Sequence, residues 1–178
     1  MRREVTTYYL EITDRAALRP ARHPTVPIDI RQAERPLPEL NRFLYVAVGR
    51  DYFWRERLKW SRERWLAYMG RPELETWVLY VAGTPAGYYE QDLQPEGNAE
   101  IVNFGMLPDF VAQGIGGHLL VHAVERGWQR GAKRVWLHTC TLDHPRALAH
   151  YQARGFRLYD QKTIERDVDD GPQSWPEI

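Results

Sequence analysis

The feature that most restricts the fold is a glycine-rich run, Gln113–His118, between an expected strand and an expected helix. Its glycines, Gly114, Gly116 and Gly117, leave the backbone uncovered where that helix begins. The first N–H groups of a helix have no partner inside it, and the helix dipole makes this end partly positive. Such an end can hold a phosphate group. The alternative is a tight turn that packs the helix closely on a strand, because a glycine run alone is a weak signal.

Two familiar phosphate-binding loops do not match this run. A P-loop ends in Gly-Lys-Ser/Thr, whereas Gly117 is followed by His118. A dinucleotide fingerprint that begins at Gly114 needs a glycine at position 119, which is Leu119. Any phosphate bound here would therefore belong to a different class of site.

The hydrophobic pattern predicts a mixed α/β fold rather than a doubly wound nucleotide fold. We expect strands at 5–12, 76–82, 86–93, 100–107, 133–140 and 156–166. We expect helices at 37–48, 52–69, 115–129 and 145–154, and an irregular or partly extended connection at 20–38. A strand–helix–strand crossover is right-handed, so the strands at 100–107 and 133–140 should be parallel neighbours.

Length and charge narrow the class of protein. The 178 residues, 43% of them hydrophobic, predict one domain over 1–178, with parts at 1–75 and 76–166 and a tail at 167–178. Basic and acidic residues number 24 each, so no overall positive field favours nucleic acid or an anionic membrane. There is no membrane-length apolar run and no signal-peptide core, and the single cysteine fits a reducing cytoplasm.

Two segments carry a resemblance to a known family. The segment Val111–Gly116, VAQGIG, resembles motif A of the GNAT superfamily of acetyl-CoA-dependent N-acetyltransferases, Gln/Arg-x-x-Gly-x-Gly/Ala. The segment Ala147–Phe156, ALAHYQARGF, resembles the second signature of that family, a helical tyrosine followed by Gly-Phe. Two signatures in the expected order are more specific than either alone. The resemblance covers 76–159 well and the N-terminal third only in the order of elements. It implies the GNAT fold, a mostly antiparallel mixed sheet with one splayed parallel pair and helices on both faces.

The resemblance also implies a cofactor site for acetyl-CoA. It places the diphosphate on the loop and the pantetheine arm along the preceding strand. The implied cofactor-binding residues are Met106, Leu107, Gln113, Gly114, Ile115, Gly116, Gly117, His118, His144 and Tyr151. Two positions depart from the family pattern: Val111 replaces the first glutamine or arginine, and His144 replaces an asparagine that commonly contacts cofactor or backbone.

Acetyl transfer to an amine needs a base, because a lysine-like amine with a pKa of about 10.4 is mostly protonated at pH 7. The resemblance favours Glu100, at the start of the strand that leads to the cofactor site, with Glu90 on the neighbouring strand as the alternative. An exposed strand carboxylate explains either residue equally simply. Tyr151 lies where the family carries the acid that protonates the thiolate, and an N–H of Met106 or Leu107 could polarise the thioester carbonyl.

Several rival interpretations of other residues stay open. Cys140, near His138 and His144, could be a nucleophile, although a free cysteine at a strand end is more commonly a small buried residue. No metal site is expected, because His118 and His122 lack the glutamate of HExxH.

The function classes that remain are an enzyme and a binding module. Our first hypothesis is an N-acetyltransferase acting by direct attack of a small-molecule or peptide amine, and the alternative is a non-catalytic acyl-CoA-binding or sensing module. The arginine–tryptophan run at 51–65 could bind single-stranded nucleic acid, but its acidic residues favour an ordinary amphipathic helix. We expect no nucleic-acid or membrane partner, and the sequence leaves a homodimer open.

Overall fold

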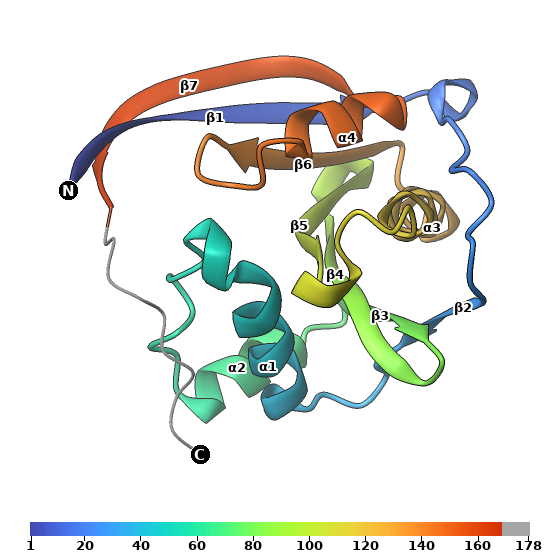
Figure 1. Cartoon of the computed structure of the whole chain (residues 1–178), viewed down its shortest axis with the longest axis horizontal. Coiled ribbons are helices and arrows are strands. Elements are labelled where there is room, and N and C mark those ends of the chain that lie inside the picture. The colour runs from blue at the N-terminus through green and yellow to red at the C-terminus, as the bar shows by residue number, and fades with distance from the viewer. Residues whose placement is uncertain (169–178) are drawn as a thin grey trace.

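The computed structural model describes residues 1–168, so the predicted tail from residue 169 onward lies outside the described residues. Seven strands form one mixed sheet with helices on both faces (Figure 1). The strands are β1 Arg2–Ile12, β2 Ile28–Gln32, β3 Leu74–Val81, β4 Thr84–Gln94, β5 Asn98–Met106, β6 Arg134–Cys140 and β7 Arg157–Asp167. The α-helices are α1 Pro38–Gly49, α2 Arg62–Met69, α3 Gly116–Gln129 and α4 Ala147–Ala153. This architecture confirms the predicted mixed α/β fold.

The strand order is β2-β3-β4-β5-β6-β1-β7, and β5 with β6 is its parallel pair. The predicted crossover through α3 is therefore confirmed. The parallel pairing covers three positions, from Asn98 opposite Arg134 to Glu100 opposite Trp136. Beyond Glu100 the two strands part, although β5 continues to Met106. The backbone edges that face each other past this point are not bonded to each other, so the sheet has a gap in its middle.

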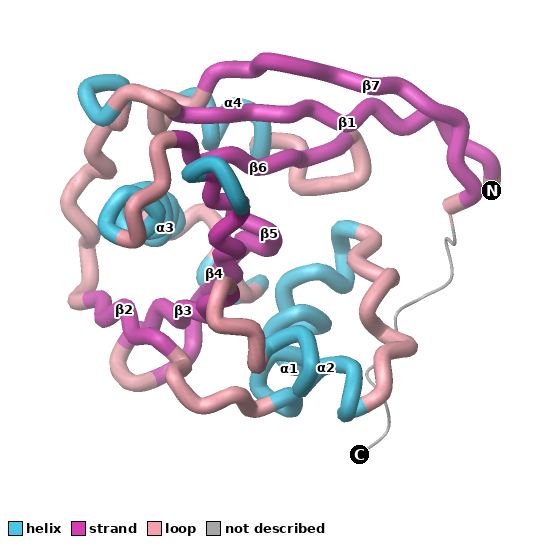
Figure 2. The backbone as a smooth tube through the Cα atoms, turned by 180° about the vertical axis from the view of Figure 1, so that it is seen from behind, coloured by secondary structure: helices cyan, strands magenta, loops and turns pink. Residues whose placement is uncertain are grey.

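The N-terminal strand lies inside the sheet, next to the edge strand β7. β1 lies between β6 and β7, antiparallel to both, with Thr7 opposite Cys140 and Ile12 opposite Val135 (Figure 2). The Met1 amino group donates a 2.8 Å hydrogen bond to the Val168 carbonyl. The strand predicted at 5–12 is confirmed, but its position next to β6 was not predicted.

The main core lies between the sheet and α3. Leu119, Leu120 and Val124 of α3 are fully buried against strand residues such as Leu10 and Leu137. Burying a leucine side chain of this kind contributes roughly 1.5–3 kcal/mol, so α3 is held firmly on its face of the sheet. The start of α3, where the glycines lie, is fixed with it.

A second core lies on the opposite face, under α1. Leu44 and Val48 of α1 pack on Val78 of β3 and Tyr88 of β4. Helices α1 and α2 thus cover the β3–β5 part of the sheet (Figure 1). None of the helices described has the length and apolar character needed to cross a membrane.

Two predicted segments differ from the structure. The helix predicted at 52–69 is wrong in its first half: α2 begins only after Ser61, whose hydroxyl accepts the Arg64 N–H at 3.2 Å. Phe53 has a left-handed backbone, with φ at 59°, which stops a right-handed helix there. Part of the connection expected at 20–38 forms the edge strand β2, which pairs with β3.

Candidate active site

The gap in the sheet opens into a cavity of about 760 Å³. Every residue of β5 from Ile101 to Met106 lines it, as do Leu137 and His138 of β6. Its other walls are the glycine loop, α4 and the connection between α1 and α2. The cavity therefore begins where the β5–β6 pairing ends.

The glycine loop forms one end of the cavity, which we call the glycine end. Gly114 has φ at +78° and Ala112 has φ at 64°, so the loop turns sharply before the helix. Helix α3 begins without a side-chain cap, and its first N–H groups have no helical partner. A Cβ on Gly116 would lie 3.4 Å from Cγ of Met106, so a side chain there would narrow the mouth of the helix. The loop leaves donors uncovered, as an anion site requires.

Not every expected loop residue offers a free donor. The His118 N–H bonds to the Ile115 carbonyl at 3.1 Å, so it is already used in the first turn of α3. Ile115 is fully buried, and its side chain belongs to the core. The Gln113 amide donates to the Asp109 carbonyl at 2.6 Å and does not line the cavity. Fewer backbone N–H groups are therefore free at the loop than the sequence indicated, and they lie within Gly114–Gly117.

Met106 and Leu107 separate into two roles. The Leu107 N–H donates to the Ala86 carbonyl of β4 at 2.9 Å, so it is not free to polarise a thioester. Backbone donors alternate in direction along an antiparallel strand. Met106, opposite Gly87, consequently directs its N–H away from β4, toward the gap beside β6. Of the two residues, Met106 is the one with a donor at the cavity.

A short segment before β2 crosses the glycine end. The strap, as we call residues 17–22, is held to α4 by the Arg19 N–H on the Arg154 carbonyl at 3.0 Å. The Arg154 guanidinium donates to the Pro20 carbonyl at 2.5 Å. The His118 ring contacts the Arg22 carbonyl. Both Arg22 and Arg154 line the cavity, so the strap adds positive charge beside the glycines.

The strap also explains a glycine of the second signature. Gly155 has φ at +104°, and a Cβ there would lie 1.9 Å from the Ala17 carbonyl oxygen. Only glycine allows both the backbone conformation and the close passage of the strap.

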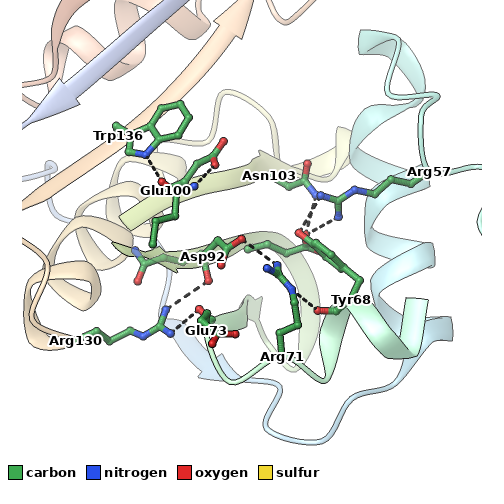
Figure 3. Close-up of polar contacts among 12 residues, drawn as sticks. Arg57, Tyr68, Arg71, Glu73, Asp92, Glu100, Asn103, Arg130 and Trp136 are labelled. Carbon is green, nitrogen blue, oxygen red and sulfur yellow. Dashed lines mark hydrogen bonds and ion pairs between the residues drawn. The ribbon is translucent and has the colours of Figure 1, made fainter. Parts of the chain in front are cut away.

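Glu100 lies at the point where β5 and β6 part. Its Oε1 is 3.9 Å from Nε2 of His138, and its Oε2 accepts the Gln94 amide at 2.7 Å. Gln94 also accepts the Trp136 indole N–H at 3.0 Å, which fixes the group (Figure 3). Burial raises the pKa of Glu100. Glu100 does not line the cavity itself, whereas His138 does, so His138 lies between the carboxylate and the open space.

Glu90 has a different environment from the one expected of a base. It is fully buried, and its Oε2 accepts hydrogen bonds from Arg57 at 2.7 Å, Tyr68 at 2.8 Å and Asn103 at 2.9 Å (Figure 3). Its Oε1 accepts from Asn41 at 2.8 Å. Glu90 is absent from the cavity wall. Its carboxylate is thus engaged in holding the α1–α2 connection on the sheet, which leaves Glu100 as the better placed carboxylate.

Tyr151 and His150 of α4 both line the cavity. Burial raises the pKa of Tyr151, which keeps its hydroxyl protonated. Its ring packs edge-on against Phe104, with centroids 6.0 Å apart. Burial lowers the pKa of His150, which favours a neutral ring, and its Nε2 is buried without a hydrogen-bond partner. The His150 ring lies beside Gly116, where α3 begins.

Cys140 and His144 also lie on the cavity wall. Burial raises the pKa of the Cys140 thiol, which disfavours the thiolate that a nucleophile needs. The His144 ring accepts the Arg146 N–H at 3.1 Å and packs edge-on against Tyr52 at 5.7 Å. Asp143 accepts hydrogen bonds from the Thr139 hydroxyl and the Cys140 N–H. It therefore holds the loop after β6 in place and does not orient a histidine as a base for Cys140. This geometry favours the structural role for Cys140.

Among the cavity residues that were not predicted as site residues are Arg22, His138, His150 and Arg154. His138 carried a usable signal, because alternation along β6 places it on the same face as Trp136 and two residues past the parallel pair. Arg22 carried none, because the strap meets the glycine loop only through the unexpected position of β1.

Comparison with known proteins agrees with this geometry. The model of the acetyltransferase (GNAT) family matches residues 37–156, which is more than half of the chain, so the chain belongs to this family. No curated protein matches the chain. A GCN5-related N-acetyltransferase from Sphaerobacter thermophilus has 21% identity and a TM-score of 0.66, covering 94% of this chain. One from Kribbella flavida has 16% identity and a TM-score of 0.65, covering 96% of it. The chain spans 53% and 60% of those two chains.

A further solved structure covers more of its own length. An aminoglycoside acetyltransferase from an uncultured soil sample has 18% identity and a TM-score of 0.58, with coverage of 71% of this chain and 86% of its own. At these identities the solved structures establish the GNAT fold. The family match begins after β1 and β2 and ends before β7.

Proposed function

We propose that the protein is an acetyl-CoA-dependent N-acetyltransferase that acts on an amine. The observation that carries the proposal is the cavity itself. It joins an uncapped helix end to the gap between β5 and β6, and the Glu100–His138 pair lies where that gap begins. Family membership supports the same activity.

The chain has suitable partners for each part of acetyl-CoA. Gly114 and Gly116 offer backbone at the cavity for the diphosphate, and Arg22 and Arg154 supply positive charge beside them. The unpaired edge of β5 at Met106 offers strand-like bonding for the amide groups of pantetheine. His150, which lines the cavity beside Gly116, adds a polar ring to this part of the wall. When bound, acetyl-CoA supplies an acetyl group activated as a thioester.

The side chains of this protein would then handle two protons. His138, backed by the Glu100 carboxylate, removes the proton that the acceptor nitrogen loses as its bond to the acetyl carbon forms. The Tyr151 hydroxyl gives a proton to the sulfur as the carbon–sulfur bond breaks. The Met106 N–H would stabilise negative charge on the carbonyl oxygen. These roles need no group other than the two substrates.

Calorimetric titration with acetyl-CoA, with ATP and NAD as controls, is the direct test. We expect micromolar binding of acetyl-CoA alone, followed by thiol release when an amine library is added. Binding without thiol release from any amine would favour the non-catalytic module instead. Absence of binding would refute the proposed cofactor.

A further inference from the structure

We propose that the acceptor is an aromatic monoamine, bound in the part of the cavity lined by β1 and by the connection between α1 and α2, which we call the acceptor end. This inference rests on the acetyl transfer proposed above and names its substrate class. It is carried by the side chains that line this acceptor end and by the way their charges are already engaged.

Several aromatic rings line the acceptor end. They come from β1, α1 and the α1–α2 connection and form what we call the ring wall: Tyr9, Tyr45, Tyr52, Phe53 and Trp54. Val5 and Val48 add apolar surface beside them. A ring of a bound amine could pack against such side chains in offset or edge-on contacts, each worth about 0.5–1.5 kcal/mol beyond burial.

The ring wall is fixed in place by the protein. Tyr45 and Trp54 pack together with centroids 5.4 Å apart. The Trp54 indole N–H donates to Asp143 at 3.4 Å. The Tyr45 hydroxyl accepts the Arg57 N–H at 3.4 Å, and the Arg57 guanidinium lies over the Tyr45 ring at 5.6 Å. Rings that are already ordered lose little freedom on binding, which favours a rigid apolar ligand.

The cavity wall offers few carboxylates to a cationic ligand. Among residues 1–168, those that line the cavity are Glu56 and Asp143. Asp143 already accepts the Thr139 hydroxyl at 2.7 Å and the Cys140 N–H at 2.9 Å. Glu56, in the connection between α1 and α2, forms an ion pair at 3.0 Å with Arg166, near the end of β7. A polyamine or aminoglycoside carries several ammonium groups, and a wall with two carboxylates and five arginines, Arg22, Arg57, Arg146, Arg154 and Arg166, offers few partners for them.

One amine still has a place. His138, with Glu100 behind it, lines the cavity, and Tyr9 packs beside His138 with ring centroids 5.9 Å apart. A single amino group at this pair, with its ring on the ring wall, would satisfy both kinds of contact.

The test compares 2-phenylethylamine with spermidine at saturating acetyl-CoA. We expect kcat/KM for 2-phenylethylamine to be at least about tenfold higher. Tyr52→Ala should raise its KM several-fold and leave the affinity for acetyl-CoA unchanged. Preference for spermidine, or binding of acetyl-CoA with no transfer to 2-phenylethylamine, would overturn the inference but leave the acetyl-CoA site intact. A protein that does not bind acetyl-CoA would instead refute the proposed function on which the inference depends.

A change of specificity gives a second, independent readout. Arg166→Gln frees Glu56 and should raise the spermidine to 2-phenylethylamine ratio of kcat/KM by about threefold or more. Arg2→Gln is the matched control, because Arg2 pairs with Glu165 at 2.7 Å on the same outer strands, and neither residue lines the cavity. An equal ratio in the two variants would contradict the role of the engaged Glu56 carboxylate.

Discussion

His138 and Glu100 meet at the place where β5 and β6 separate, with Nε2 of the imidazole 3.9 Å from Oε1 of the carboxylate. Glu100 is the last residue of β5 in the parallel pairing, and His138 lies two residues beyond the last paired position of β6. The carboxylate is sheltered inside the sheet while the imidazole faces the cavity. The pair therefore connects a fixed negative charge to the space where an amine would react.

Glu100→Gln should lower kcat by roughly 10²-fold or more, because His138 loses the carboxylate that supports it as the base. Burial raises the pKa of Glu100. Since the charged form is the active one, the rate should fall as the pH drops through this raised pKa. The Gln variant should lose the part of the acidic limb that comes from protonation of Glu100, and the pH–rate profile measures it. Unchanged affinity for acetyl-CoA is the control, and an unchanged profile would exclude Glu100.

Tyr151→Phe should lower kcat by roughly 10²-fold, because the variant keeps the packing of the ring and loses the proton donor. Burial raises the pKa of Tyr151, so the donor stays protonated over the working pH range. Steady-state kinetics measures the effect. Tyr8→Phe is the matched control, since Tyr8 packs on the core and does not line the cavity. Equal turnover in the two variants would remove Tyr151 from the mechanism.

Gly114→Ala should weaken acetyl-CoA binding, whereas Gly131→Ala should not. Both glycines have positive φ, at +78° and +90°, and an added Cβ meets nothing within 4 Å at either. Each substitution should therefore cost about 1–2 kcal/mol of stability through backbone strain alone. Denaturation measures this shared cost, and calorimetry measures the difference in binding. A similar loss of affinity in both variants would mean that strain, rather than the loop, accounts for the effect.

Arg22→Gln should weaken acetyl-CoA binding by roughly tenfold or more, the loss expected for a charge-assisted hydrogen bond of about 1.5–3 kcal/mol. Raising the salt concentration should narrow the gap between variant and parent. Arg19→Gln is the control, because Arg19 is held through its backbone N–H and its side chain does not line the cavity. Identical affinities for the two variants would place the strap outside the cofactor site.

Arg57→Met should destabilise the protein by about 3–5 kcal/mol, because it leaves a buried carboxylate without its cation. The partner is Glu90, which is fully buried and 2.7 Å from the guanidinium. Adding Glu90→Gln to Arg57→Met should recover part of the loss, since no unpaired charge remains. Urea unfolding of both variants measures this. A double variant that is less stable than the single one would show that the ion pair is not the source of the cost.

Much of the fold follows from the sequence because its elements are strongly patterned. The period-two runs give β3 to β6 and the helical period of Leu119, Leu120 and Val124 gives α3. The glycine loop lies where its sequence indicates, before α3. The helical pattern over 52–69 gave a wrong prediction for the first half of the segment, because Trp54 packs over Gly49 and Arg57 turns inward to Glu90. Tertiary contacts outweighed local propensity there.

The site was only partly predictable for a related reason. Glu100, Tyr151 and the glycines could be placed from motifs, and the structure puts Tyr151 and the glycines on one cavity, with Glu100 behind His138. The sequence could not separate Glu100 from Glu90, because their difference lies in partners from three other segments. Arg22 reaches the cavity only because β1 lies inside the sheet, and strand order is not written in any local pattern.

The position of β1 between β6 and β7 also determines when the cavity can form during synthesis. Among the described strands β1 is made first, yet both of its neighbours, β6 and β7, are made last. Pairs such as Arg2 with Asp167 join opposite ends of the sequence, and contacts of such long range slow folding. Until they form, β1 has both edges exposed, and the strap that follows it has no α4 to bind. The glycine end of the cavity therefore cannot form until translation has passed β6, α4 and β7, and chaperone protection of the nascent β1 should matter more here than for a strand that pairs with its sequence neighbour.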